Sequence, residues 1–326
     1  MKRIFNIALL AFLCLNISCG KDDEPGGTLG EEKIIEWEML MDLGDGVRSF
    51  AITDDANFLF YTNSAGRFYR VNTATNQETE ILSGISKSGV GFVNVINGIV
   101  YGTYVSNGRG YFAVSTDLGD TFAEHQVGVF TNVPAGQYEG AFIRPVLNRL
   151  YQLPNGQLMI PHIYDNTNSN NMPNDSKLIV VSDDGGATWE RRNSEHSFIS
   201  ALRGNTLYAA SLNWLGDFNI GEKGNLYESN DYGATWKESS LLFAPQAVDR
   251  ENNLVAADYY KVCKLKNNKW ISYEAEEGAT HSPLVSNVVY SNTLGNVNKK
   301  LADIQFDLAN NIYVLSANRI YKSRLD

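Results

Sequence analysis

The chain is built from short apolar runs separated by polar turns, from about residue 30 to its end. Typical examples are "NVINGIVYGTY" (94–104), "YQLPNGQLMIP" (151–161) and "ALRGNTLYAAS" (201–211). Each reads as two short strands joined by a turn that contains Gly or Asn. No amphipathic helical period stands out after residue 30. Short strands at regular intervals predict an all-β fold of the sandwich, barrel or propeller type.

Internal repetition narrows this choice. The segments "SDDGGATW" (182–189) and "SNDYGATW" (229–236) are nearly the same octet, and "STDLGDTF" (115–122) is a weaker copy. All three fit the pattern S-x-D-x-G-x-T followed by an aromatic residue. Each octet follows one apolar run and precedes another, so we expect it to form the turn between the third and fourth strands of a repeated unit.

Aligning the runs around the octets extends the repeat to six units. The segments 67–82 and 261–274 keep the strand, the turn and the following strand but lack the octet. A hairpin precedes the third strand of each of the first five units, at 52–62, 94–104, 151–161, 201–211 and 248–258. The sixth unit is divided between the two ends of the chain.

The segment 304–326 supplies three strands of this last unit, and "KIIEWEMLMD" (33–42) supplies a fourth. We therefore predict a six-bladed β-propeller over residues 31–326, a single domain whose N-terminal strand closes the last blade as its outermost strand. Such closure leaves no seam of the ring unpaired.

The N-terminus has the features of an export signal. Two basic residues precede an apolar run from Ile4 to Leu15, which is too short to span a bilayer. Cys19 follows Ser18, and this region resembles a bacterial lipoprotein signal in which the cysteine becomes lipidated. The "GKDDE" after Cys19 is similar to the export tag of surface lipoproteins of the Bacteroidota.

The resemblance implies a signal peptide over residues 1–18 and lipidation of Cys19. It also implies an outer-membrane lipoprotein exposed at the cell surface, which contacts the membrane through its lipid only. Residues 19–30 read as a flexible tether. A simple signal peptide with an incidental Cys19 is the alternative.

Charge and side-chain chemistry exclude several classes of partner. Without residues 1–18 the chain carries 25 basic and 37 acidic side chains, a net charge of 25 − 37 = −12, which disfavours nucleic acid. The four histidines are scattered, so no metal site is predicted. No Gly-rich phosphate loop occurs, and we predict no cofactor. Cys263 reads as a small buried residue on a strand.

The octet has a physical explanation as a turn. Its aspartate accepts hydrogen bonds within the turn, glycines such as Gly185 and Gly233 permit a left-handed backbone, and the tryptophan buries its ring against the blade. The octets resemble the Asp-box (BNR) repeats of sialidase-like β-propellers, which implies a structural and non-catalytic role. The residues concerned are Ser115, Asp117, Gly119, Ser182, Asp184, Gly186, Trp189, Ser229, Asp231, Gly233 and Trp236.

The segment 142–189 resembles the sialidase blade in which an arginine-bearing strand leads into an Asp box. The resemblance makes Arg144 the matching arginine of a carboxylate clamp. No arginine lies between Arg149 and Arg191 to serve as a second clamp residue, and the following loop offers mainly Asn between Asp165 and Asp175. These departures weigh against sialidase activity.

Candidate catalytic residues are few. Tyr138 and Glu139 are adjacent, like a sialidase nucleophile and its base, but neighbouring strand residues point to opposite faces. Asp165 and Asp217 are the other acidic candidates. Whether the protein is an enzyme stays open, with a glycoside hydrolase as the class to test.

Two long loops, 162–176 and 213–224, predict a ligand face. Trp214 with Phe218 would form a platform for a sugar ring, although a loop folded onto its own blade would give the same sequence. Arg144, His162 and Tyr164 complete the expected ligand-binding set. We expect a non-catalytic propeller that binds a glycan or a surface protein; the alternatives are a sialidase-like hydrolase and a structural partner in an envelope complex.

Overall fold

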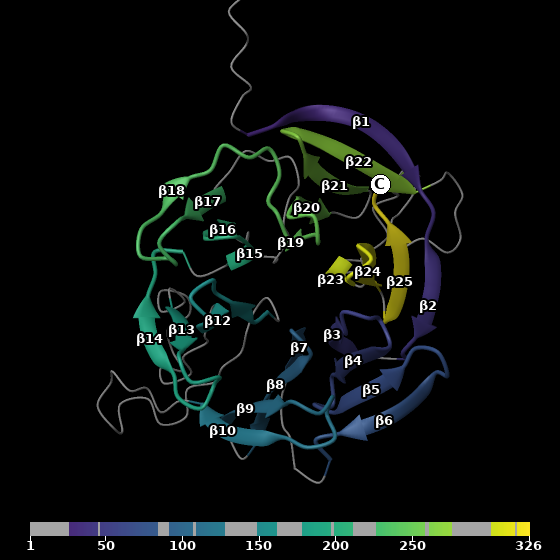
Figure 1. The fold of residues 1–326 in the computed structure, drawn as a ribbon, viewed down its shortest axis with the longest axis vertical. Helices are drawn as coiled ribbons and strands as arrows, with labels where there is room; N and C mark the ends of the chain where they lie inside the picture. The colour runs from purple at the N-terminus through teal and green to yellow at the C-terminus, as the bar shows by residue number, and fades with distance from the viewer. Residues whose placement is uncertain are drawn as a thin grey trace, which may run out of the picture.

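The structure is a computed structural model, which describes residues 26–44, 46–83, 91–106, 109–127, 149–161, 178–196, 199–210, 226–257, 261–275, 301–316 and 318–326. Within these ranges 25 strands form six sheets that stand around a central axis like the blades of a propeller (Figure 1). The predicted all-β, six-bladed architecture is therefore confirmed. The described ranges contain no helix long and apolar enough to cross a membrane.

Blades 1 to 4 are antiparallel sheets of four strands that follow one another in chain order. Blade 1 consists of β3 (Val47–Ile52), β4 (Phe58–Asn63), β5 (Phe68–Asn72) and β6 (Gln77–Ile81). Blade 2 consists of β7 (Phe92–Ile96), β8 (Ile99–Ser106), β9 (Arg109–Ser115) and β10 (Ala123–Val127). Blade 3 consists of β11 (Tyr151–Gln152), β12 (Leu158–Pro161), β13 (Leu178–Ser182) and β14 (Glu190–Asn193). Blade 4 consists of β15 (Ile199–Arg203), β16 (Thr206–Ala210), β17 (Leu226–Ser229) and β18 (Lys237–Glu238).

Blade 6 joins the two ends of the described chain. It consists of β23 (Leu301–Phe306), β24 (Asn311–Ser316), β25 (Arg319–Arg324) and the N-terminal β2 (Glu38–Asp42). Strand β2 pairs antiparallel with β25 at the outer edge, with Glu38 opposite Lys322 and Asp42 opposite Arg319. The prediction that an N-terminal strand closes the last blade is confirmed.

The segment 33–42 is nevertheless not one strand. Blade 5 consists of β19 (Ala247–Val248), β20 (Leu254–Ala257), β21 (Lys261–Lys266), β22 (Lys269–Ala275) and, as a fifth and parallel strand, β1 (Thr28–Ile35). The N-terminal segment thus runs along the rim of two neighbouring blades (Figure 1). Trp37 lies between β1 and β2 and packs, half-buried, on the cluster between blades 5 and 6.

The end of the predicted tether also belongs to the folded body. Residues 28–30 are part of β1, and the indole N–H of Trp270 donates to the carbonyl oxygen of Gly26 at 3.1 Å. The composition of 19–30, rich in Gly and charge, concealed this because β1 has little apolar periodicity of its own. Residues 1–25 lie outside the described residues.

The core is divided radially between the blades. Among the described residues, buried apolar side chains form six clusters, and each lies between two adjacent blades. The unbroken apolar run of strand β12, "LMIP", has a simple reason. Leu158 and Ile160 face blade 2, whereas Met159 faces blade 4. Both faces of an inner strand are covered, so alternation of polar and apolar residues disappears there.

The two ends of the ring differ in their connections. Hairpins between first and second strands, and turns between third and fourth strands, lie at one end, called here the hairpin face. Connections between second and third strands lie at the other end, called here the connection face. The second-to-third connections of blades 3 and 4, after Pro161 and after Ala210, both leave toward the connection face.

Candidate functional site

The ligand-binding and catalytic residues expected from the sequence lie outside the described residues. These are Tyr138, Glu139, Arg144, His162, Tyr164, Asp165, Trp214, Asp217 and Phe218, as well as Cys19. The strands that flank residues 162–177 belong to blade 3, and those that flank residues 211–225 belong to blade 4. In both blades the flanking strand ends lie at the connection face. The expectation that these loops share a face rests on that arrangement.

The three octets form turns of the same geometry. In the turn of blade 3, the hydroxyl of Ser182 donates to Oδ1 of Asp184 at 2.8 Å and accepts from the N–H of Gly186 at 2.8 Å. The N–H of Thr188 donates to Asp184 Oδ1 at 2.8 Å, and the Thr188 hydroxyl donates to Oδ2 at 2.6 Å. The turns at Asp117 and Asp231 repeat these four bonds. Both oxygens of each aspartate are therefore used inside its own turn.

These hydrogen bonds hold the octet carboxylates ionised. The hydroxyl and N–H of the threonine lower the pKa of Asp117 and of Asp231 to about 2. At Asp184 burial raises the pKa, but the bonds from Thr188 and Ser182 outweigh it and bring the value to about 2. An acid with so low a pKa is a poor proton donor near neutral pH.

The octet turns also fasten each blade to the preceding one. Trp189 is buried and packs edge-to-face on Phe112 of blade 2, with ring centroids 4.9 Å apart. A Cβ on Gly186 would lie 2.1 Å from the Phe112 ring, where the backbone φ is +99°. The glycine that the turn requires is thus Gly186, whereas Gly185 has open space around it and only its φ of +73° to favour glycine.

A circuit of hydrogen bonds links the inner strands around the channel. Ser49 of blade 1 exchanges two bonds with the backbone of Val93 in blade 2, at 3.1 and 3.2 Å. Asn94 Oδ1 accepts from the N–H of Leu150 at 3.4 Å and so links blade 2 to the entry of blade 3. The Tyr151 hydroxyl donates to the carbonyl of Ile199 in blade 4 at 3.3 Å.

Arg149 makes the widest link. Its guanidinium donates to the carbonyl of Ser200 in the first strand of blade 4 and to the carbonyl of Gln246, directly before the first strand of blade 5. It also lies 3.4 Å from the carboxylate of Asp303 in blade 6. Asp303 is buried, which raises the pKa of its carboxyl to about 6, although the charge of Arg149 opposes that rise. Burial likewise raises the pKa of Tyr151 to about 12.

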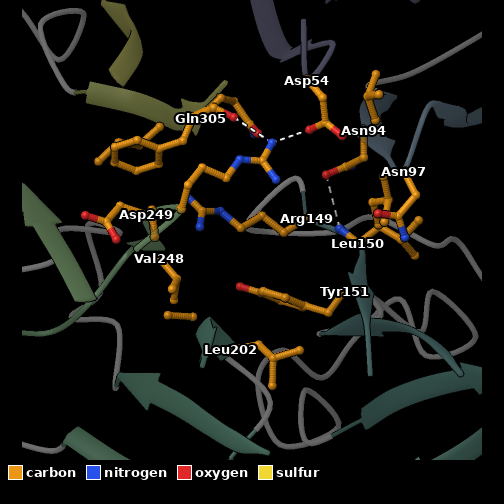
Figure 2. Close-up of a pocket in the computed structure, with 17 residues that line it drawn as sticks. Asp54, Asn94, Asn97, Arg149, Leu150, Tyr151, Leu202, Val248, Asp249 and Gln305 are labelled. Atoms are coloured by element: carbon orange, nitrogen blue, oxygen red, sulfur yellow. Dashed lines mark hydrogen bonds and ion pairs between the residues drawn. The ribbon is translucent and has the colours of Figure 1, made fainter. Parts of the chain in front are cut away.

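A cavity of about 310 Å³ lies in the channel at the hairpin face (Figure 2). Every blade contributes to its lining, with Asp54, Asn94, Arg149, Leu202, Val248 and Gln305 as one residue from each. In Figure 2 the Arg149 guanidinium and the Tyr151 hydroxyl both point into this space. Two arginines and two aspartates line the cavity, together with aliphatic side chains.

The two carboxylates of the cavity already have partners. Asp54 pairs with Arg250 at the rim, and Arg250 also donates to the carbonyl of Phe306 at 2.9 Å. Asp249 accepts two N–H bonds of its own hairpin on Oδ1, and its Oδ2 lies 3.0 Å from Nζ of the buried Lys264. Burial raises the pKa of Asp249, but the bonds from Asn253 and Lys264 outweigh it and keep the value below its usual range.

No motif in the sequence marks this cavity. Its polar residues lie inside ordinary strand and hairpin segments such as "NVINGIV" and "VDRENNL", which differ from other hairpins by no motif. The sequence gives one signal of the cavity, which is Arg149 close to the start of a strand. A charged side chain beside an inner strand is seldom buried unless it has a partner. Among the described residues, no group of three or more His, Cys, Asp or Glu side chains is placed to hold a metal ion.

Comparisons with known proteins do not assign this chain to a family. No family model matches the chain, and no curated protein matches its sequence. A streptogramin B lyase is similar in structure, with 12% identity and a TM-score of 0.47, covering 90% of this chain and 98% of its own. YCF48 bound to D1 peptide has 12% identity and a TM-score of 0.48, with coverage of 92% and 100%.

A calcium-binding protein, regucalcin from Agrobacterium tumefaciens str. C58, has 10% identity and a TM-score of 0.49, with coverage of 90% and 95%. At these identities and TM-scores the likenesses carry no information on a ligand or a reaction.

Proposed function

We propose that this chain is a surface-exposed outer-membrane lipoprotein, attached through Cys19, whose propeller binds a glycan or a protein ligand without catalysis. The three octet turns have the hydrogen bonds expected of Asp boxes, and their aromatic residues pack on the preceding blade, Trp189 fully buried and Phe122 and Trp236 partly buried, which supports placing the chain among Asp-box propellers. The ligand face in this proposal is the connection face, with loops 162–176 and 213–224.

The proposal of a non-catalytic role is supported by the pairing and ionisation of the described carboxylates. Hydrolysis of a glycosidic bond needs two carboxylic groups that face one site, one of them able to donate a proton. Among the described residues that line the central cavity, Asp54 and Asp249 are each paired with a cation. The octet aspartates are ionised and bonded within their turns.

A glycan array tests the proposal directly. The described fold begins at Gly26, so protein from residue 20 onward retains all of it without the lipid. We expect binding to a subset of glycans and its loss in Trp214→Ala, with Trp236→Phe as a control that alters a tryptophan of an octet turn. If no glycan binds, the ligand is a protein, and capture of a cell-surface protein by the same material becomes the next measurement.

The sialidase-like hydrolase remains the competing enzyme proposal. Its candidate groups are Glu139, Asp165 and Asp217, with Tyr138 as nucleophile. Release of a chromogenic aglycone that is lost in Asp165→Ala or Glu139→Ala would replace the binding proposal with this one. Release that survives all three acid-to-alanine changes would refute these residues as catalytic groups.

One observation favours the structural-partner alternative. Strand β1 is the outermost strand of blade 5, and it exposes Leu29 and Ile34 at 69% and 65% of their surface. An open strand edge with exposed apolar side chains is a surface on which another chain can pair. Co-purification of an envelope protein that is lost in Leu29→Lys/Ile34→Lys would support this alternative.

A further inference from the structure

The cavity at the hairpin face holds a buried hydrogen-bond donor without an acceptor. Asn94 is 7% exposed, and its Oδ1 is held by the N–H of Leu150. The second polar atom of this amide is the donor Nδ2. In the described part of the chain Nδ2 has no hydrogen-bond partner. A buried donor without a partner is energetically unfavourable, so the position favours a ligand that brings an acceptor.

A cation lines the same cavity and is fixed by the backbone. Carbonyl oxygens of Ser200 and Gln246 hold Nη1 of Arg149. The contact of Nη2 with Asp303 is long, at 3.4 Å, and the same Asp303 oxygen also accepts from the N–H of Ile304 at 2.9 Å. Arg149 is thus oriented by neutral groups and only weakly engaged by its counter-ion. The Tyr151 hydroxyl also lies at this wall, but its proton is donated to the carbonyl of Ile199 at 3.3 Å.

The cavity offers few acceptors in return. Its carboxylates, Asp54 and Asp249, are occupied by Arg250 and by Lys264. The rest of the wall contains aliphatic side chains, including Leu202 and Val248 (Figure 2). A volume of about 310 Å³ is at the lower end of small-molecule sites.

These features together point to one class of ligand. We infer that the cavity binds a small aliphatic carboxylate, whose oxygens accept from Asn94 Nδ2 and the Arg149 guanidinium and whose carbon chain packs against Leu202 and Val248. A monoanion fits because Arg149 is the one cation here that its counter-ion engages only weakly, at 3.4 Å, whereas Arg250 and Lys264 are paired with Asp54 and Asp249. A phosphate or sulfate dianion would add a second uncompensated charge and has no apolar part for the aliphatic wall. This site lies at the opposite mouth from the proposed ligand face, and the inference is independent of that proposal.

The test uses butyrate as the probe and protein from residue 20 onward. Saturation-transfer NMR titration measures its dissociation constant, with butyramide as the neutral isostere and sulfate as a competing anion. We expect butyrate to bind, butyramide to bind at least tenfold more weakly, and sulfate to compete poorly. Asn94→Asp keeps an oxygen for Leu150 but replaces the donor with a like charge, so butyrate should bind at least tenfold more weakly.

Matched variants separate binding from folding and from surface charge. Asn155→Asp makes the same change at an exposed hairpin tip of blade 3 and should leave butyrate binding unchanged. Leu202→Phe fills the cavity and should abolish binding while the melting temperature shows that the protein is folded.

Four results would overturn the inference, and three of them concern the site itself. These three are equal binding of butyrate and butyramide, competition by sulfate as strong as that of another carboxylate, and wild-type affinity in folded Asn94→Asp or Leu202→Phe protein. Loss of binding in Asn155→Asp would also overturn it, because overall charge would then explain the effect.

Discussion

The guanidinium of Arg149, at the entry of blade 3, lies 3.4 Å from the buried carboxylate of Asp303 in blade 6. The same guanidinium reaches carbonyls that lead into blades 4 and 5. One side chain therefore joins four of the six blades at the axis, where the strands themselves make no sheet hydrogen bonds to one another.

Replacing Arg149 should destabilise the ring as a whole. Arg149→Met leaves Asp303 buried without its cation and the two carbonyls without a donor, so we expect a loss of about 3–5 kcal/mol in the free energy of unfolding. Urea denaturation followed by circular dichroism measures it. Arg203→Met, which removes an arginine bonded to the Tyr208 hydroxyl within blade 4, is the control and should cost far less. Equal losses would contradict the role of Arg149 at the axis.

Asp303 should make the protein less stable as pH rises through the acid range. Its pKa in the fold is about 6, above the ordinary value of 3.8, so the folded state keeps a proton that the unfolded chain has lost. The contribution is full below pH 4 and is lost as pH rises to about 6; two pKa units correspond to about 3 kcal/mol. Urea denaturation at pH 4, 5, 6 and 7 should show this slope in the wild type and not in Asp303→Asn. Parallel pH profiles of the two proteins would refute it.

The two adjacent glycines of the blade 3 octet should respond differently to alanine. Gly186→Ala places a methyl group 2.1 Å from Phe112, and we expect a loss of more than about 3 kcal/mol or failure to fold. Gly185→Ala meets no atom within 4 Å and bears only the strain of its positive φ, about 1 kcal/mol. Thermal melting of both variants is the measurement, and the prediction fails if Gly185→Ala is the more destabilised.

The octet aspartates should stabilise the fold without serving the ligand. Asp184→Ala removes three hydrogen bonds of an exposed turn, so we expect a loss of about 1–2 kcal/mol with binding unchanged. Because the pKa of Asp184 is lowered to about 2, its contribution is present above pH 4 and is lost as pH falls toward 2. Asp183→Ala is the matched control, since within the described ranges the side chain of this neighbour accepts a single hydrogen bond, from Gln157. A ligand-binding defect in Asp184→Ala would contradict the structural assignment.

Stepwise removal of the N-terminal segment should reveal two separate roles. Protein that begins at Trp37 lacks β1, which leaves the buried Trp270 at the edge of blade 5 without the carbonyl of Gly26. Protein that begins at Leu43 also lacks β2, and the outer edge of blade 6 is then unpaired. We expect a moderate drop in melting temperature for the first and a much larger drop for the second. Similar melting curves for the two truncated proteins would show that β2 does not close the ring.

The repeat explains why the fold could be predicted. Strands, turns and blade number follow from local patterns such as the octets and the hairpins at 52–62 and 248–258, and β2 was found because the last unit lacked a strand. Strand β1 was missed, since its parallel pairing with β22 depends on an edge 240 residues away and leaves no alternating pattern in "TLGEEKII".

The central cavity could not be predicted for a similar reason. Asn94, Arg149 and Asp303 are brought together only by the closure of the ring, and each belongs to a different blade. A sequence pattern records which side of a strand faces a neighbouring blade. It does not record which single side chains meet at the axis, because that depends on the summed tilt of six sheets.

The pairing of β2 with β25 also fixes an order of events during biosynthesis. The strand that contains Glu38 is made first among those of its blade, yet its partner Lys322 is made only after the strands of the other five blades. The other five blades can form before β2 pairs with β25, and this pairing joins residues that are far apart in the sequence. Contacts of such long sequence separation form slowly, so the nascent protein carries β2 without its partner strand until β25 has been synthesised.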